Sequence, residues 1–243
     1  ITRKCAAALA VGCTTVVKPA SQTPFSALAV AELAKAAGFP DGVFNIVTGS
    51  AKEIGMELTK NPKIKKISFT GSTEVGKILM EQSASTVKKL SMELGGHAPF
   101  IVFEDANIDE AVTGALQSKF RNSGQTCICT NRLFVHEKVY DSFLEKFTNE
   151  VKKIKVGNGL NDGIVSGPLI DKSSLDKVID HVQDAVNTGA KIAVGGEVHS
   201  LGGNFYQPTV LSNVSTEAKI TFEETFGPVA PLYKFSSDDE VIK

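Results

Sequence analysis

The sequence predicts an α/β fold in which a mostly parallel β-sheet is covered by helices on both faces. Short β-branched runs alternate with helical stretches along the 243-residue chain, and the links between them are short. Such alternation is typical of parallel sheets, because each parallel connection needs a crossover that packs on a face of the sheet. The length allows one large core or two smaller ones.

The first part of the chain alternates between helix and strand. Its helical segments are rich in alanine or carry apolar residues at helical spacing, and its strands are short β-branched runs. Gly12 and Gly38 follow two of the helices, where glycine ends a helix most readily. The predicted helices are 1–12, 24–37, 51–60 and 73–83, and the predicted strands are 14–17, 43–47, 66–70 and 87–94.

The same alternation continues beyond Gly95-Gly96, where we place a domain boundary. Asn107 is a candidate N-cap for the first helix of this part. A glycine-rich loop is predicted over 157–168, and a further helix begins near Asp239. The predicted strands are 100–103, 133–135, 190–194 and 229–235, and the predicted helices are 108–119, 140–153 and 173–188.

Composition excludes several classes of function. The net charge is -1, which gives no electrostatic footprint for nucleic acid. No apolar run approaches the roughly 20 residues that span a bilayer. Four cysteines in a chain of this length form no disulfide framework, so a reducing compartment is expected. Neither the spacing of these cysteines nor that of the four histidines fits a metal site. The chain starts without methionine, so we expect a segment truncated at both ends.

Two side chains stand in unusual local surroundings. Cys127 lies in a polar, glycine-containing segment, which favours an accessible, reactive thiol over a buried structural one. Glu93 is a lone acid between the apolar residues Met92 and Leu94. We interpret the thiol as a nucleophile and the carboxylate as a general base. A strand-end acid that faces solvent is the alternative for Glu93.

Phosphate-binding features occur near two predicted strand ends. Thr70, Gly71 and Ser72 join a strand to a helix, where free backbone N–H groups can bind a phosphate. An ordinary tight turn would have the same sequence. Lys18 also closes a strand, and it could bind a ribose or a phosphate, or be a surface lysine. Ser21 does not repel the 2′-phosphate of NADP as an acid there would.

Taken together, these residues resemble the aldehyde dehydrogenase superfamily over essentially the whole chain. The matching segments are Lys18-Pro19-Ala20-Ser21-Gln22-Thr23-Pro24, Phe69-Thr70-Gly71-Ser72, Glu93-Leu94-Gly95-Gly96, Gly124-Gln125-Thr126-Cys127 and Glu223-Glu224-Thr225-Phe226-Gly227-Pro228. Within the superfamily, the chain is most similar to the succinate-semialdehyde dehydrogenases of the bacterial, NADP-preferring type. The segments that carry this second likeness are Ile1-Thr2-Arg3-Lys4, Lys119-Phe120-Arg121-Asn122 and Cys127-Ile128-Cys129.

The resemblance implies a Rossmann-like dinucleotide-binding domain over 1–94 and an α/β catalytic domain over 95–243, both incomplete. It implies Cys127 as nucleophile, Glu93 as general base and Glu224 on the nicotinamide ribose. NADP or NAD is the implied cofactor, with NADP favoured because Ser21 stands where NAD-preferring relatives often carry glutamate. The implied cofactor-binding residues are Lys18, Ser21, Thr70, Gly71, Ser72, Glu224 and Phe226. An oxyanion-hole asparagine would precede Ile1.

The resemblance also assigns the substrate and its partners. Arg3 and Arg121 would bind the far carboxylate of a semialdehyde, although spacing alone favours a surface ion pair for each. Cys129 is either a packing residue or the partner of Cys127 in a reversible, regulatory disulfide. A homodimer or homotetramer is implied, in the cytoplasm, or in mitochondria if the source is eukaryotic.

The sequence therefore predicts oxidation of succinate semialdehyde to succinate through a thiohemiacetal and a thioester on Cys127. Glutarate semialdehyde, or another aldehyde, is the alternative substrate. A catalytically silent fragment or relative with a structural or binding role is the alternative from a different class.

Overall fold

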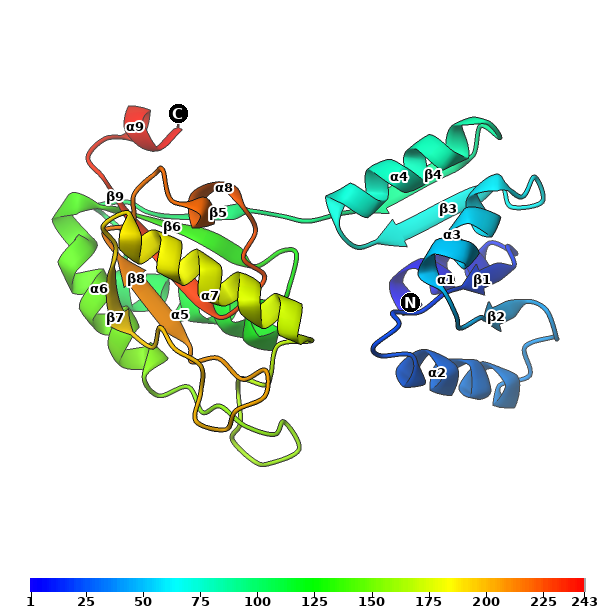
Figure 1. Cartoon of the computed structure of the whole chain (residues 1–243), viewed down its shortest axis with the longest axis horizontal. Coiled ribbons are helices and arrows are strands. Elements are labelled where there is room, and N and C mark those ends of the chain that lie inside the picture. Colours follow the sequence, from blue (N-terminus) through cyan, green and yellow to red (C-terminus); the bar gives the residue numbers. More distant parts are fainter. Residues whose placement is uncertain (243) are drawn as a thin grey trace. The chain divides into compact units, whose positions relative to one another are not determined.

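The computed structural model describes residues 1–242, which form two compact α/β units. The first unit is Ile1–Gly95 and the second begins at Gly96 (Figure 1). Most paired strands are parallel, so the predicted fold class is confirmed. The roles predicted for the two parts of the chain, dinucleotide binding and catalysis, stay predictions.

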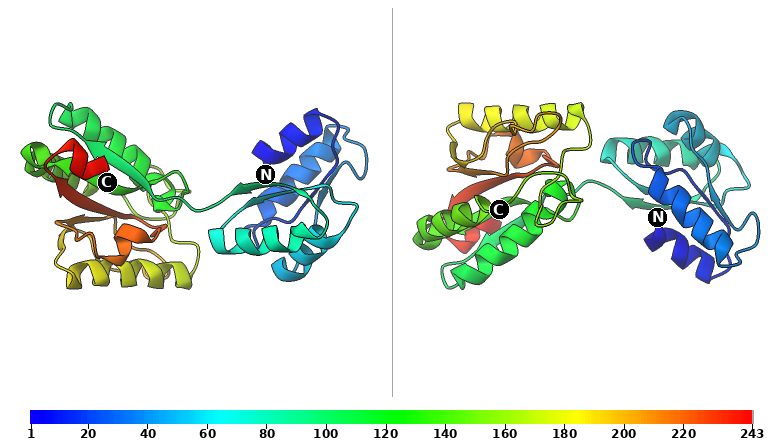
Figure 2. Two further views of the ribbon diagram at one scale, coloured as in Figure 1. Left: turned by 90° about the horizontal axis from the view of Figure 1, so that it is seen from above. Right: turned by 90° about the horizontal axis from the view of Figure 1, so that it is seen from below.

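The first unit contains two separate parallel strand pairs, β1 with β2 and β3 with β4. Helices α1 and α2 lie on one side of these strands and α3 and α4 on the other (Figure 2). All the elements predicted for this part are present, with bounds shifted by a few residues. They are α1 (Thr2–Ala10), β1 (Thr15–Val17), α2 (Phe25–Ala36), β2 (Phe44–Ile46), α3 (Ala51–Lys60), β3 (Lys66–Thr70), α4 (Thr73–Ala84) and β4 (Lys89–Glu93).

The register of β3 and β4 sets which residues meet at the edge of this pair. Thr70 is opposite Glu93, so both strands end together. Ser72 then caps α4, because its Oγ accepts a hydrogen bond of 3.3 Å from the backbone N–H of Val75. Gly71, between strand and helix, donates its N–H to the Glu93 carbonyl over 3.1 Å.

The second unit is built on a five-stranded sheet of order β5-β6-β9-β8-β7. Only β7 runs antiparallel to its neighbour, β8. The elements are β5 (Ala98–Val102), α5 (Ile108–Phe120), β6 (Thr130–His136), α6 (Glu137–Val151), α7 (Lys172–Asn187), β7 (Lys191–Val194), β8 (Thr209–Ser212), α8 (Lys219–Phe222), β9 (Val229–Phe235) and α9 (Asp238–Ile242). A 3₁₀ turn, Arg121–Gly124, joins α5 to the loop before β6.

Helices cover both faces of this sheet, which gives the second unit three layers (Figure 2). On one face α5 and α6 bury aromatic residues such as Phe120, Phe143 and Phe147 against the strands. On the other face α7 and α8 bury Val178 and Ile220. The predicted covering of the sheet by helices on both faces is confirmed for this unit.

Three elements differ from the predictions. Strand β8 and the four-residue helix α8 were not expected from the sequence. All four residues of β8 are buried between β7 and β9, so distant pairing determines this strand. Helix α6 begins at Glu137 rather than near 140, since the His136 side chain caps it through the Lys138 N–H. Among residues 1–242, no helix combines the length and apolar character needed to cross a membrane.

Candidate functional site

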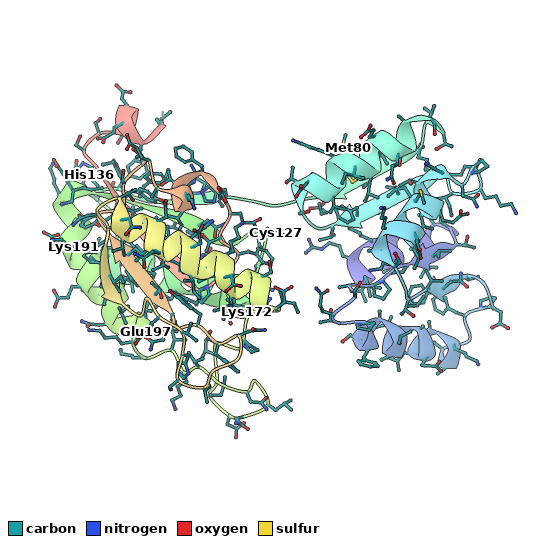
Figure 3. The ribbon with its side chains drawn as sticks, in the orientation of Figure 1. Met80, Cys127, His136, Lys172, Lys191 and Glu197 are labelled. Atoms are coloured by element: carbon teal, nitrogen blue, oxygen red, sulfur yellow. The ribbon has the colours of Figure 1, made fainter. Side chains whose placement is uncertain are left out.

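Cys127, labelled in Figure 3, lies in the second unit. The segment of backbone that precedes it is unusually strained. Asn122 and Ser123 have φ values of 50° and 56°, and Gly124 has a φ of 73°. Three consecutive residues therefore lie in the left-handed region, which residues other than glycine rarely adopt. Backbone strain of this kind is concentrated at functional sites, where the surrounding structure must hold it in place.

Hydrogen bonds and close packing hold the strained turn. The Ser123 hydroxyl donates to the Gly167 carbonyl over 3.0 Å, and its oxygen lies 3.0 Å from the Ser166 hydroxyl oxygen. The Gln125 side chain accepts the Ile170 N–H over 2.9 Å. A Cβ atom at Gly124 would lie only 2.0 Å from the Gly227 carbonyl oxygen, so that position admits only glycine. The turn is thus bound to two distant segments.

The two cysteines of the loop lie in different surroundings. Cys127 is partly exposed, and its backbone N–H has no acceptor within residues 1–242. Cys129 is 1% exposed, and its thiol donates to the Lys119 carbonyl over 3.0 Å. Burial raises the pKa of the Cys129 thiol, although the Lys119 charge opposes the shift. The accessible thiol is therefore Cys127, as the sequence predicted, and all cysteines are free.

Glu224 lies close to the backbone that supports Cys127. Its Oε1 accepts the Gly96 N–H over 3.2 Å, and Lys177 Nζ donates to its carbonyl over 2.6 Å. A Cβ atom at Gly96 would lie 2.2 Å from the Cys127 carbonyl oxygen. Gly96 therefore contacts both predicted site residues. Burial raises the pKa of the Glu224 carboxyl, and the hydrogen bond from Gly96 opposes this.

Phe226 shares the loop of Glu224. It has a φ of 53° and is 37% exposed, so a large apolar side chain on left-handed backbone is partly open to solvent. An exposed ring beside a polar site can contact a flat ligand. The prediction that Glu224 and Phe226 bind the dinucleotide stays a prediction.

Glu93, Thr70, Gly71 and Ser72 meet at the carboxyl ends of β3 and β4 in the first unit. Glu93 is exposed, so a solvent-facing acid stays an alternative to a general base. Sequence reasoning missed Lys4, whose Nζ donates to the Phe69 carbonyl over 2.6 Å. Burial lowers the pKa of Lys4, while the charge of nearby Glu93 raises it. Lys4 lies in the segment Ile1-Thr2-Arg3-Lys4 that carries the family resemblance, but no role was assigned to it there.

Lys18 and Ser21 form a second polar group in the same unit. Lys18 Nζ donates to the Ser21 hydroxyl over 2.9 Å. An ammonium and a hydroxyl at this distance can bind the same phosphate or ribose oxygen. Lys18 follows β1, whereas Gly71 follows β3 of the other strand pair.

The two predicted substrate arginines are both exposed. Arg121 is the first residue of the 3₁₀ turn before Cys127, and Arg3 lies on α1 of the first unit. Neither takes part in an ion pair within the part of the chain that the structure describes. The alternative of a surface ion pair is therefore not realised, and both guanidinium groups are available to an anion.

Sequence reasoning also missed a buried lysine behind the Cys127 loop. Lys119 is 0% exposed, at the end of α5. Val112, Ala115 and Lys119 are all buried and follow the i, i+3, i+7 spacing of a core-facing stripe. A charged residue on that stripe was the sequence signal that could have identified Lys119.

Within residues 1–242, no group of three His, Cys, Asp or Glu residues could hold a metal ion.

Comparisons with known proteins indicate the family of this chain. A model of the aldehyde dehydrogenase family matches residues 1–243. Succinate-semialdehyde dehydrogenase [NADP(+)] GabD of Escherichia coli K12 is 60% identical over 242 residues, which are 100% of this chain and 50% of that protein. Glutarate-semialdehyde dehydrogenase of Pseudomonas aeruginosa is 57% identical, with the same shares covered.

A solved structure shows the same fold. The crystal structure of an E. coli NADP-dependent enzyme matches with a TM-score of 0.98 and 59% identity, and the match covers 99% of this chain and 50% of that one. The chain therefore spans about half the length of the relatives that it matches.

Proposed function

Because this chain belongs to the aldehyde dehydrogenase family, we propose that the full-length protein carrying it oxidises succinate semialdehyde to succinate with NADP⁺. The observation that carries the proposal is the partly exposed thiol of Cys127. This residue comes shortly after three residues of left-handed backbone, and its backbone N–H has no acceptor within residues 1–242. The name of the E. coli relative, a succinate-semialdehyde dehydrogenase [NADP(+)], supports both the substrate and the cofactor.

Cys127 is the nucleophile in this proposal. Its sulfur attacks the aldehyde carbon, a C–S bond forms, and the carbonyl oxygen becomes an oxyanion in a thiohemiacetal. The unpaired backbone N–H of Cys127 donates to that oxyanion; removing such a donor costs roughly 3–4 kcal/mol in other enzymes. When bound, NADP⁺ supplies the acceptor for the hydride that leaves this carbon.

Glu93 is the general base for the second half of the reaction. Its carboxylate takes a proton from water, and the resulting hydroxide oxygen attacks the thioester carbon. The C–S bond breaks, the carboxylic acid leaves, and the Cys127 thiolate is regenerated. The exposed position of Glu93 at the end of β4 leaves its carboxylate open to water.

The donors of the first unit fit a phosphorylated dinucleotide. Lys18 and Ser21 would bind the 2′-phosphate of the ribose, since their side chains already lie within hydrogen-bonding distance and both can donate. Thr70, Gly71 and Ser72 would bind the pyrophosphate at the start of α4. In the second unit, Glu224 and Phe226 would contact the nicotinamide ribose and ring.

Arg121 and Arg3 would bind the substrate carboxylate. A guanidinium group pairs with a carboxylate through two parallel hydrogen bonds, which favours semialdehydes over uncharged aldehydes. Glutarate semialdehyde is one methylene longer, and a Pseudomonas relative is named for it. A homodimer or homotetramer, and a cytoplasmic or mitochondrial location, remain expectations from the family resemblance.

The experiment measures NADPH formation by the full-length protein. The unmodified protein should oxidise succinate semialdehyde faster than glutarate semialdehyde, and Cys127→Ala should abolish turnover. Cys13→Ala is the matched control, because Cys13 is an exposed cysteine outside the proposed site. Undiminished oxidation by Cys127→Ala would exclude the assignment, and an inactive unmodified protein would favour the silent relative.

Arg121→Ala tests the substrate class separately. The KM for succinate semialdehyde should rise far more than the KM for an uncharged aldehyde of similar length, since only the former loses an ion pair. Equal effects on both substrates would exclude Arg121 as the carboxylate anchor.

A further inference from the structure

Lys119 is fully buried, yet no carboxylate in residues 1–242 forms an ion pair with it. Its Nζ donates a hydrogen bond of 3.0 Å to Asn131 Oδ1, and a second side-chain hydrogen bond joins it to Cys129. Burying an ammonium group this way is costly, and lysine is almost never fully buried without a partner. Burial lowers the pKa of Lys119, and the nearby Cys129 and Glu224 side chains oppose that shift.

The lysine determines which way the Asn131 amide points. Asn131 is 2% exposed, so its amide has no access to solvent. An ammonium group has three donors and no acceptor, so the oxygen of the amide must face Lys119. The amide nitrogen therefore faces Gly96, and it donates to the Gly96 carbonyl over 3.1 Å.

Gly96 connects Asn131 to the proposed active site. Its carbonyl is bound by Asn131, while its N–H is bound by Glu224 Oε1. Its backbone also lies against the Cys127 carbonyl, where a Cβ atom would be 2.2 Å away. Glycine has no side chain to anchor it, so these contacts hold this peptide in place.

Lys119 holds the Cys127 loop from a second direction as well. Its backbone carbonyl accepts the Cys129 thiol over 3.0 Å, at the residue where the loop enters β6. The side chain of this buried residue thus binds Asn131, which in turn binds the Gly96 peptide, while its carbonyl binds Cys129 at the end of the loop.

We propose that Lys119 is a positioning residue for the dinucleotide and nucleophile sites, acting through Asn131 and Gly96 on Glu224 and on the Cys127 backbone. The inference rests on the proposed function, because it assumes that Glu224 binds the nicotinamide ribose. Lys119 itself touches neither substrate nor cofactor.

The test measures the Kd of NADP⁺ by calorimetric titration of the full-length protein without aldehyde, so that turnover plays no part. Lys119→Met keeps the length of the side chain and removes its donor. The Asn131 oxygen then has no partner, the amide can rotate, and Gly96 loses its restraint. We expect the Kd to rise about tenfold, as for the loss of one hydrogen bond that involves a charged group.

Asn131→Asp separates positioning from packing. An aspartate still pairs with Lys119, so the core charge keeps its partner, but an acceptor oxygen replaces the donor that faces the Gly96 carbonyl. The Kd should rise by a similar factor. In the double variant Lys119→Met, Asn131→Asp, the rise in Kd should be far smaller than the product of the two single rises, because both changes break the same chain of contacts. Lys138→Met is the control, since Lys138 is an exposed lysine of α6 that pairs with Glu104.

An unchanged Kd in a folded Lys119→Met or Asn131→Asp protein overturns the inference. If Lys119→Met does not fold, Asn131→Asp alone decides. Failure of the unmodified protein to bind NADP⁺ refutes the proposed function and this inference with it, whereas normal binding by all variants refutes only the role of Lys119.

Discussion

Replacing Gly124 with alanine tests whether the loop before Cys127 depends on its contact with Gly227. The new Cβ atom would lie 2.0 Å from the Gly227 carbonyl oxygen, and real Cβ atoms essentially never come closer than 3.0 Å. The two backbone segments must therefore separate by about 1 Å, and a shift of that size at a catalytic group can cost about 100-fold in rate. This corresponds to about 2.7 kcal/mol in the activation barrier.

The same substitution also introduces local strain. Gly124 has a φ of 73°, and left-handed backbone costs a residue with a Cβ roughly 1–2 kcal/mol. Gly202→Ala is the matched control, because Gly202 has a φ of 69° but nothing within 4 Å of its Cβ position. Both variants should lose a similar amount of unfolding free energy to strain, with a further loss in Gly124→Ala from the separation of the segments.

The assay combines urea unfolding with kcat at saturating succinate semialdehyde in the full-length protein. Gly202→Ala should keep its kcat, and Gly124→Ala should lose about 100-fold. If folded Gly124→Ala retains kcat within about threefold of the unmodified protein, the contact with Gly227 does not position Cys127. Equal losses in both variants would assign the effect to backbone strain alone.

Three further predictions concern the cofactor, the second cysteine and pH. Ser21→Glu should reverse the ratio of kcat/KM for NADP⁺ to that for NAD⁺, because a carboxylate beside Lys18 repels the 2′-phosphate; an unchanged ratio would place that phosphate elsewhere. Inactivation by peroxide should be reversed by dithiol in the unmodified protein but not in Cys129→Ala, and identical recovery would exclude a disulfide with Cys127. Burial lowers the pKa of His181 below its ordinary value of 6.5. As pH decreases, His181 is therefore protonated at a higher pH in the unfolded chain than in the folded protein. The contribution of His181 to the unfolding free energy should be complete above about pH 6.5 and should decrease as the pH falls below that value. His181→Gln should show a shallower fall in urea titrations, and an identical slope would contradict this.

Local pattern accounts for most of the fold. The alternation of β-branched and helical segments predicted every element of the first unit, because neighbouring residues largely decide helix periods and caps such as Ser72. Strand β8 was missed for the opposite reason. Its four residues carry no alternation, and only their burial between β7 and β9 makes them a strand.

For the site, the sequence by itself determined the chemical groups: the thiol of Cys127, the carboxylate of Glu93 and the cation of Lys18 occupy motifs that are readable without coordinates. Only the tertiary structure decided that Cys129, two residues after the accessible Cys127, is buried against the Lys119 carbonyl. It also decided that Lys119 lies in the core with Asn131 as its partner. The physical reason is that burial and hydrogen-bond partners depend on segments distant in sequence, whereas the identity of a reactive group is local.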